Sequence, residues 1–245
     1  MLRAFLIAAL VLPYTAVAAA IGLFHAAVTG SDVLLFRLGH AGVRLALLLA
    51  GTRIALEGRE NLGDARNTVV ISNHVSHLDG PVLFEALGTD LRAVVKKEIF
   101  SWPFLGPVLR RAGFVAVNRR DRIQSGQALS RAAESLRAGS CFLVFPEGTR
   151  SRTGELGAFK KGGFVIGIEA GSRILPVVVQ GGRELMPAGG FRIRSGTVRV
   201  RVLDPIDAKG YSYADRDRLA AEVHARIAAA LEDLRAGTGG EPTAA

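Results

Sequence analysis

The stretch that decides the fold is Val69-Val70-Ile71-Ser72-Asn73-His74, a short apolar run that ends in polar side chains. Successive β-branched residues bounded by polar ones are typical of a buried strand, and residues 80–88 that follow have a helical pattern. The same order, a short β-rich run and then a helix, repeats along the chain from residue 66 onward. This alternation predicts an α/β fold with a largely parallel central sheet flanked by helices.

The other expected elements follow the same rule. Expected strands lie at residues 69–72, 92–95, 114–117, 141–145, 174–179 and 197–202. Expected helices lie at residues 80–88, 104–111, 121–138, 161–170 and 213–235. The run 197–202 alternates apolar and basic residues, which predicts an exposed or edge strand. We therefore expect one α/β domain at 51–235, preceded by N-terminal helices at 1–50 and followed by a disordered tail at 236–245.

The composition supports a well-packed domain with an anionic partner. Hydrophobic residues make up 49% of the 245 residues, enough for a sizeable core. The formal net charge is +9, and only five of the 31 basic residues are lysine. A basic chain attracts anions, so the candidate partners are nucleic acid, an anionic bilayer and a phosphorylated substrate. A genome rich in arginine and alanine codons explains part of this charge equally well, so composition alone does not choose among them.

The single cysteine, Cys141, excludes an intrachain disulfide and a thiol-rich metal site. It begins an apolar run at residues 141–145, and no activating base is evident near it in the sequence. We expect Cys141 to pack as a small hydrophobic side chain instead of acting as a nucleophile.

Residues 4–28 are almost wholly apolar, and three interpretations compete for them. One is a cleaved secretory signal, with Arg3 before the apolar run and small residues at 16–18 as the cleavage site. The second is a transmembrane helix, because 25 residues reach about 37 Å against a bilayer core of about 30 Å. The third is one arm of a helical hairpin that lies partly in a single leaflet.

The following segment favours a membrane anchor over a cleaved signal. Residues 29–32 predict a turn and a helix N-cap, and residues 33–50 resume the apolar pattern. Arg37, His40 and Arg44 share one face of that helix. Two arginines within the bilayer cost about 2.5–3.5 kcal/mol each, whereas an interfacial helix with its basic stripe facing lipid phosphates avoids this cost. Whether the first helix spans the membrane stays open, and the basic remainder is expected on the cytoplasmic side.

His74 and Asp79 lie in the loop that follows the first quoted strand. The spacing His-x4-Asp lets this loop fold back, so that the carboxylate orients the imidazole as a base for removing a proton from a hydroxyl. A histidine that merely caps a strand or helix is the competing interpretation of this pair. A metal pair of His74 and His77 is a further interpretation, but no third ligand is suitably placed, and we expect no metal.

Basic residues follow two further strands. Arg119 ends the run at 113–119, and arginine at the carboxyl end of a strand suits bidentate phosphate binding. Lys97 follows the strand at 92–95 and adds charge to the same pocket if it is not simply a solvated surface lysine.

The run at 145–151, Phe-Pro-Glu-Gly-Thr-Arg-Ser, also leaves a strand. Backbone amides near Gly148, the Thr149 hydroxyl and Arg150 are suited to holding an anion, while Glu147 can accept a hydroxyl proton or brace the arginines. The helix that follows residues 159–163 adds an N-terminus that also favours anions. Residues 175–179 are chemically inert and are expected to shape an apolar wall of the site.

Taken together, these blocks resemble the glycerophospholipid acyltransferase family, in particular 1-acyl-sn-glycerol-3-phosphate acyltransferases. The four blocks occur in the family's order, at residues 73–79, 113–119, 145–151 and 175–179, within a resemblance that covers roughly 55–205. The family's paired N-terminal membrane helices fit residues 4–50, and 51–235 would be the acyltransferase domain. One departure is that Val115 and Asn118 stand where the family often has a bulkier apolar residue and an aspartate.

The resemblance implies roles for individual residues. His74 would be the general base and Asp79 its partner. The acceptor-phosphate site would comprise Arg119, Glu147, Gly148, Thr149 and Arg150, with Lys97 as a weaker addition.

The implied reaction moves a fatty acyl group from acyl-CoA or acyl-carrier protein to the 2-hydroxyl of 1-acyl-sn-glycerol-3-phosphate, giving phosphatidic acid. It needs no metal or bound cofactor, and it takes place at the cytoplasmic face of the cell membrane, where the helices anchor the chain. Two alternatives stay open: another lysolipid acceptor, such as a lysophospholipid or lyso-ornithine lipid, and an ester or thioester hydrolase. A nucleic-acid partner is not expected, because aromatic residues do not interleave with the basic ones on one face.

Overall fold

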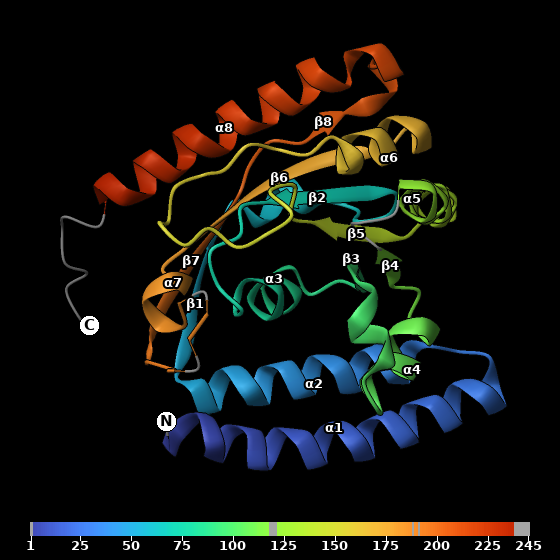
Figure 1. Ribbon diagram of the computed structural model, residues 1–245, viewed down its shortest axis with the longest axis vertical. Coiled ribbons are helices and arrows are strands. Elements are labelled where there is room, and N and C mark those ends of the chain that lie inside the picture. The colour runs from blue at the N-terminus through green and yellow to red at the C-terminus, as the bar shows by residue number, and fades with distance from the viewer. Residues whose placement is uncertain (1, 118–121, 188, 191, 238–245) are drawn as a thin grey trace.

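The computed structural model describes residues 2–117, 122–187, 189–190 and 192–237. These residues form an α/β domain around a central sheet, with a pair of long N-terminal helices along one side (Figure 1). The sheet order is β1-β7-β6-β2-β5-β3-β4, and β8 pairs with β6 off this path. The expected fold class, an α/β fold with a mostly parallel sheet preceded by two apolar helices, is confirmed.

The bounds of the elements agree closely with those expected. The strands are β1 (Thr52–Glu57), β2 (Thr68–Ser72), β3 (Leu91–Lys96), β4 (Val115–Val117), β5 (Cys141–Val144), β6 (Arg173–Gln180), β7 (Gly196–Val202) and β8 (Ile206–Asp207). The α-helices are α1 (Leu2–Thr29), α2 (Val33–Ala50), α3 (Asp79–Leu87), α4 (Leu105–Arg111), α5 (Arg122–Arg137), α6 (Gly162–Ala170), α7 (Gly182–Leu185) and α8 (Arg216–Ala236). Short 3-10 helices are η1 (Arg59–Leu62), η2 (Lys97–Ser101), η3 (Ala208–Gly210) and η4 (Tyr213–Asp215). Helix α8 thus includes Ala236, and residues 238–245 of the expected tail lie outside the described residues.

Strand β2 lies between β6 and β5 in a parallel set formed by β6, β2, β5, β3 and β4. Val70 pairs with Leu143 of β5 on one side and with Leu175 of β6 on the other. Because neighbouring parallel strands end at the same edge, the segments that follow these five strands gather there. This edge receives the loops that carry the motifs at 73–79 and 145–151.

Helices cover both faces of the sheet, which explains why the quoted strand is continuously apolar. Val69 and Ile71 pack in one cluster with α5, α6 and α8, while Val70 packs on the opposite face with α3. The two faces alternate along the strand because successive side chains of a strand point in opposite directions. Val178 and Val179 of β6 divide between the same two clusters and are fully buried, so residues 175–179 contribute core packing at their positions in the sheet.

The run 197–202 was expected to be exposed or at an edge, but β7 lies inside the sheet between β1 and β6. Its valines pack in the core on the α3 side, and its arginines point to the other face. There Arg201 forms ion pairs with Glu57 of β1 and Asp233 of α8. The edge strand on this side of the sheet is β1, which the sequence analysis did not predict.

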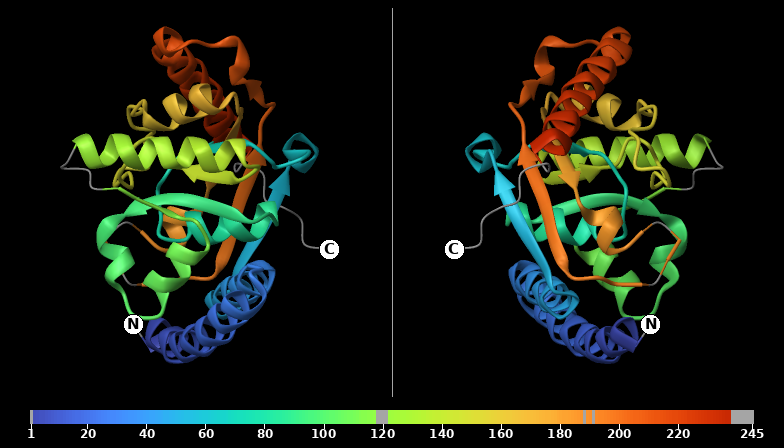
Figure 2. Two further views of the ribbon diagram at one scale, coloured as in Figure 1. Left: turned by 90° about the vertical axis from the view of Figure 1, so that its right-hand side faces the viewer. Right: turned by 90° about the vertical axis from the view of Figure 1, so that its left-hand side faces the viewer.

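Helices α1 and α2 form an antiparallel hairpin that lies against α3 and α4 (Figures 1 and 2). Glycines allow the two helices to approach closely, because a Cβ on Gly42 would lie 2.6 Å from the Tyr14 ring. The Tyr14 hydroxyl donates a 2.8 Å hydrogen bond to the Leu38 carbonyl. Both helices are long and apolar enough to cross a membrane by length and composition.

The basic stripe of α2 was expected to face lipid phosphates, and the structure corrects this for two of its three residues. The His40 ring stacks on Phe84 of α3 at a centroid distance of 4.0 Å. Arg44 forms a 2.7 Å ion pair with Glu85 of the same helix. Only Arg37 points away without such a partner among the described residues. Two side chains that seemed suited to lipid, His40 and Arg44, therefore help to hold the hairpin on the domain.

Candidate active site

The site begins where β2 ends, and Asn73 fixes the geometry of the loop there. Its side chain accepts a hydrogen bond from the Val179 amide at 2.9 Å and donates one to the Val179 carbonyl at 2.8 Å. Asn73 thereby continues the pairing between β2 and β6 by one more residue. This buried contact starts the 73–79 loop from a rigid point of the sheet.

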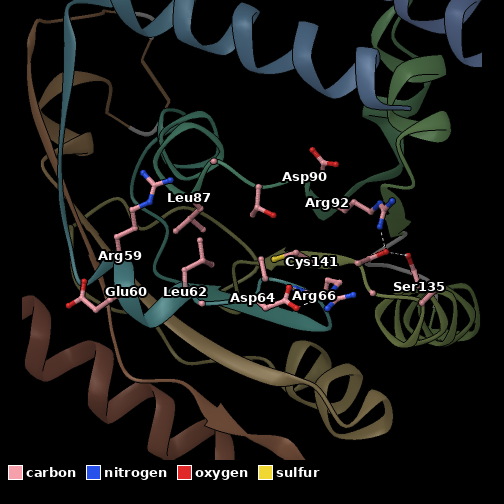
Figure 3. Close-up of a pocket in the computed structure, with 17 residues that line it drawn as sticks. Arg59, Glu60, Leu62, Asp64, Arg66, Leu87, Asp90, Arg92, Ser135 and Cys141 are labelled. Atoms are coloured by element: carbon pink, nitrogen blue, oxygen red, sulfur yellow. Dashed lines mark hydrogen bonds and ion pairs between the residues drawn. The ribbon is translucent and has the colours of Figure 1, made fainter. Parts of the chain in front are cut away.

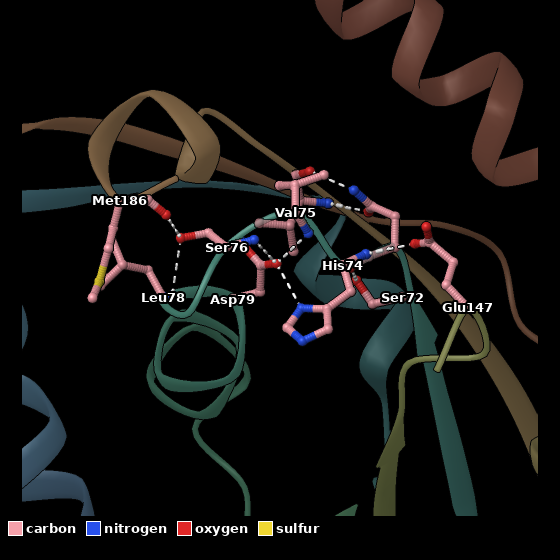
Figure 4. Close-up of polar contacts among 10 residues, drawn as sticks. Ser72, His74, Val75, Ser76, Leu78, Asp79, Glu147 and Met186 are labelled. Carbon is pink, nitrogen blue, oxygen red and sulfur yellow. Dashed lines mark hydrogen bonds and ion pairs between the residues drawn. The ribbon is translucent and has the colours of Figure 1, made fainter. Parts of the chain in front are cut away.

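His74 and Asp79 meet across this loop (Figure 4). His74 Nδ1 lies 2.9 Å from Asp79 Oδ2, and the carboxylate is fully buried. The same oxygen accepts hydrogen bonds from the Val75 and Ser76 amides, each at 2.7 Å. Asp79 begins α3, so its negative charge also lies at the favourable end of the helix dipole.

This arrangement assigns the tautomer of His74. An ionised carboxylate only accepts hydrogen bonds, so Nδ1 carries the proton and Nε2 is left with its lone pair. The ring stacks on Phe145 with centroids 4.0 Å apart, which fixes its plane. The side chain remains 20% exposed. His74 is therefore an oriented imidazole that is still accessible, the form required of a general base.

Glu147 joins the two motif loops. Its Oε1 accepts a hydrogen bond from the His74 amide at 2.8 Å (Figure 4). Its Oε2 accepts one from the Gly157 amide at 3.1 Å. Burial raises the pKa of this carboxyl above its ordinary value, and the two amides partly oppose that rise. A second link runs from the Ser151 amide to the His74 carbonyl at 2.7 Å. The carboxylate thus faces backbone amides and fixes the position of the 73–79 loop.

Arg150 brings an unpaired cation to the same region. Its Nη1 is buried and has no hydrogen-bond partner among the described residues. The guanidinium lies close enough to His77 to affect that ring: burial lowers the pKa of His77, and the Arg150 charge lowers it further. A buried donor without a partner costs about 1–3 kcal/mol, so an anion placed beside Arg150 would be stabilised.

Of the other expected phosphate residues, Gly148, Thr149 and Lys97 follow β5 and β3 at the same edge of the sheet. Gly148 has a φ of 70°, and a Cβ there would lie 2.8 Å from Lys160 Nζ. Thr149 is exposed. Lys97 follows β3, is exposed, and makes no hydrogen bond or ion pair with a described residue. Arg119 lies outside the described residues.

Two residues that the sequence analysis did not assign to the site contribute to it. Gly182 begins α7, and a Cβ there would lie 2.8 Å from Asp79 Oδ1, so only glycine lets α7 approach the carboxylate this closely. Lys160 extends along Gly148 and places an ammonium group beside the 145–151 loop. The lysine belongs to a run already noted as the start of a helix, whereas nothing in the sequence links Gly182 with Asp79.

A pocket of about 990 Å³ lies at the opposite edge of the sheet, away from His74 (Figure 3). Its lining includes Arg59, Asp90, Arg92 and Cys141, near the amino ends of β3 and β5. Burial raises the pKa of Cys141 to about 12, in keeping with the apolar packing expected for it. In the part of the chain that the structure describes, no group of three or more His, Cys, Asp or Glu side chains is placed to hold a metal ion.

The family model described as Acyltransferase matches residues 53–180, just over half of the chain and the part that carries the His74 and Arg150 loops. This chain belongs to the Acyltransferase family. The family resemblance found in the sequence is therefore confirmed. The matched region contains strands β2 to β6. Because it ends with β6, it also contains the segments that follow β2, β3, β4 and β5.

Relatives of this chain are named 1-acyl-sn-glycerol-3-phosphate acyltransferases. A human protein named 1-acyl-sn-glycerol-3-phosphate acyltransferase alpha is 30% identical over 81% of this chain and 72% of its own length. The chloroplastic protein LPAT1 of Arabidopsis thaliana is 35% identical over 74% of this chain but only 49% of its own length, so this chain spans about half of that relative.

A solved structure supports the same kinship. The crystal structure of the 1-acyl-sn-glycerophosphate acyltransferase PlsC from Thermotoga maritima aligns with a TM-score of 0.80 and 28% identity. The alignment covers 96% of this chain and 94% of that one. The likeness thus includes the hairpin as well as the α/β domain.

Proposed function

We propose that this acyltransferase transfers a fatty acyl group from acyl-CoA or acyl-carrier protein to the 2-hydroxyl of 1-acyl-sn-glycerol-3-phosphate, giving phosphatidic acid. The observation that carries the proposal is the His74–Asp79 pair at 2.9 Å, beside a buried Arg150 nitrogen with no partner among the described residues. A base for a hydroxyl and a cation for a phosphate are the two groups that this acceptor needs. The names of the relatives agree with this choice.

The reaction follows from the tautomer of His74. The acceptor hydroxyl gives its proton to Nε2 while its oxygen attacks the carbonyl carbon of the thioester. Asp79 stabilises the imidazolium that forms. The tetrahedral intermediate then collapses, the carbon–sulfur bond breaks, and the thiolate takes the proton back from His74. Because the thioester donor is already activated, the chain needs no nucleophile, bound cofactor or metal of its own.

The acceptor phosphate is held by the cations of the carboxyl edge. Arg150 contributes a guanidinium suited to bidentate contact with two phosphate oxygens. Lys97, Lys160 and Arg119 add positive charge, and the Gly148 and Thr149 backbone shapes the loop. Glu147 positions this loop against His74 through two backbone amides instead of contacting the anion.

The acceptor reaches the site from the membrane. Helix α1 exposes a continuous apolar face, and α2 is packed between α1 and α3 by contacts that include Leu47 and the Arg44–Glu85 pair. A hairpin docked along the domain cannot cross a bilayer without leaving α3. We therefore favour insertion into one leaflet at the cytoplasmic face, with the domain lying on the lipid surface.

An acceptor panel tests the proposal. The purified full-length protein is supplied in detergent micelles with a labelled acyl donor, either acyl-CoA or acyl-carrier protein. The acceptors are lysophosphatidate, lysophospholipids with larger head groups and lyso-ornithine lipid. We expect label in phosphatidic acid and much weaker use of acceptors that lack a phosphate monoester. Label that accumulates as free fatty acid would indicate a hydrolase, and equal use of all acceptors would contradict the phosphate site.

A further inference from the structure

Two aromatic side chains in a single loop outside the hairpin are exposed. Trp102 is 58% exposed and Phe104 is 56% exposed, in the loop between η2 and α4. Among the described residues, the other exposed large hydrophobic side chains belong to α1 and α2, with the single exception of Tyr213. Apart from Tyr213, the exposed large hydrophobic side chains of the described residues thus belong to the hairpin and to this one loop.

The backbone of the loop holds Phe104 outward. Phe104 has a φ of 62°, one of two non-glycine residues with a positive φ in the described part of the chain. The Gly106 amide donates to the Trp102 carbonyl at 2.9 Å, and a Cβ on Gly106 would lie 2.1 Å from the Phe100 carbonyl oxygen. A strained conformation that exposes a phenyl ring points to a function for the ring outside the fold.

The loop is fixed beside α1. Arg111 of α4 forms a 2.7 Å ion pair with Asp32 and donates a 3.0 Å hydrogen bond to the Gly30 carbonyl, both in the turn of the hairpin. Leu23 of α1 and Val108 of α4 share one apolar cluster. Both views place α4 and the segment before it against α1 (Figures 1 and 2). Loop and hairpin therefore present one continuous surface.

The apolar face of α1 continues toward this loop. Six exposed side chains fall within about 60° of the helix circumference, since successive residues turn by about 100°; they are Leu6, Leu10, Val17, Ile21, Phe24 and Val28. Phe24 and Val28 lie at the end of α1 where α4 is attached.

We propose that Trp102 and Phe104 insert into the lipid bilayer beside α1 and form a second membrane-contacting element of this protein. The proposal rests on the membrane association included in the proposed function. A lipid surface is the occupant because the loop continues the apolar face of α1 and is flanked by the exposed cations Lys96, Lys97 and Arg110. Tryptophan beside basic residues suits the headgroup layer of an anionic membrane. The inserted loop holds the carboxyl end of β3, and with it Lys97, at the depth of the lipid phosphates.

Trp102 is the only tryptophan of the chain, so its fluorescence reports on this loop alone. The full-length protein is mixed with phosphatidylcholine–phosphatidylglycerol vesicles, with and without lipids brominated on the acyl chain. We expect a blue shift of the emission, quenching by the brominated lipids, and protection from aqueous iodide. The proposal would be overturned if the protein sediments with the vesicles but iodide still quenches the Trp102 emission.

A matched variant moves the reporter. In Trp102→Phe/Tyr213→Trp the single tryptophan lies in η4, on the far side of the domain from the hairpin (Figure 1). This reporter should remain accessible to iodide and unquenched by brominated lipid while the protein still sediments with vesicles. Equal brominated-lipid quenching of both reporters would mean that the effect is not specific to the loop.

A second variant separates lipid contact from folding. Phe104→Gly removes the ring and also relieves the positive φ, so the thermal midpoint should not fall. Its affinity for the vesicles should fall several-fold, whereas Tyr213→Ala should bind like the original chain. Unchanged affinity of Phe104→Gly would contradict the proposal. No acyl donor is present in these measurements, so they stand even if the proposed reaction fails.

Discussion

One carboxylate oxygen of Asp79 accepts three hydrogen bonds, one from His74 and two from backbone amides. Asp79 therefore both orients the imidazole and holds the loop closed. In Asp79→Asn an amide replaces the acceptor, and the neutral side chain no longer stabilises the imidazolium. We expect kcat to fall by about 10³- to 10⁴-fold with little change in the circular dichroism spectrum. A loss below tenfold would mean that Asp79 serves only the fold of the loop.

Arg150 should act on acceptor binding. Removing a charged hydrogen-bond donor costs about 1.5–3 kcal/mol, so Arg150→Gln should raise KM for lysophosphatidate by roughly 10- to 100-fold. Arg152→Gln removes the same charge from an exposed position two residues away and is the matched control. Steady-state kinetics with varied lysophosphatidate measures both. Equal effects of the two variants would point to general surface charge instead of a specific phosphate contact.

Cys141 gives a prediction that depends on pH. Its pKa is raised from 9.0 to about 12 by burial, so the native state keeps a proton that the unfolded state releases. The stability that this provides is present below pH 9 and is lost as the pH rises from 9.0 through about 12. At pH 9 iodoacetamide should alkylate the native protein several hundredfold more slowly than the urea-unfolded protein, at roughly the ratio of their thiolate fractions. Similar rates would show that the side chain is not buried.

At the scale of single elements, α7 must approach the catalytic loop without a side chain at Gly182. In Gly182→Ala the new methyl group meets Asp79 Oδ1 and Ser76, so α7 or the loop has to shift. We expect a loss of stability of about 1–3 kcal/mol and a reduced kcat, measured by urea unfolding and by turnover. Gly126→Ala is the control, because nothing lies within 4 Å of its Cβ position and alanine favours a helix. Normal turnover in Gly182→Ala would show that α7 does not position Asp79.

The elements that the sequence predicted are those with a complete local pattern. Strand β2 is apolar on both faces because helices cover both, and His74 could be paired with Asp79 because both lie on one loop. Strand β1 was missed because two of its three exposed residues, Arg53 and Glu57, are charged and its pattern is short. Strand β7 seemed to be an edge because its charge partners, Glu57 and Asp233, lie far away in the sequence.

The same distinction applies to the candidate site. Glu147 accepts hydrogen bonds from the amides of His74 and Gly157, which lie 73 and 10 residues away from it in the sequence. No local sequence pattern indicates either contact. Gly182 approaches Asp79 only after β6 has returned the chain to the same edge. Residue identity therefore predicted which chemistry is present, and the topology decided which residues support it.

At the scale of the whole molecule, docking of the hairpin predicts its relation to the membrane. If the hairpin lies in one leaflet, its turn and the α/β domain face the same side. Ser31→Cys reports the turn, and Glu232→Cys reports α8 as the reference; buried Cys141 gives little background. An impermeant maleimide should label both in inverted membrane vesicles and neither in intact cells. Labelling of the turn from the opposite side would mean that the helices span.

The central claim is that His74 is the base for acyl transfer, and two histidines on the same loop test it most directly. The measurement is kcat/KM for lysophosphatidate with a labelled acyl donor, for His74→Ala and for His77→Ala. We predict a loss of about 10²- to 10⁴-fold for His74→Ala and a change of no more than about threefold for His77→Ala. Vesicle binding should be the same in both variants. Near-normal turnover of His74→Ala, or an equal loss in His77→Ala, would contradict the assignment.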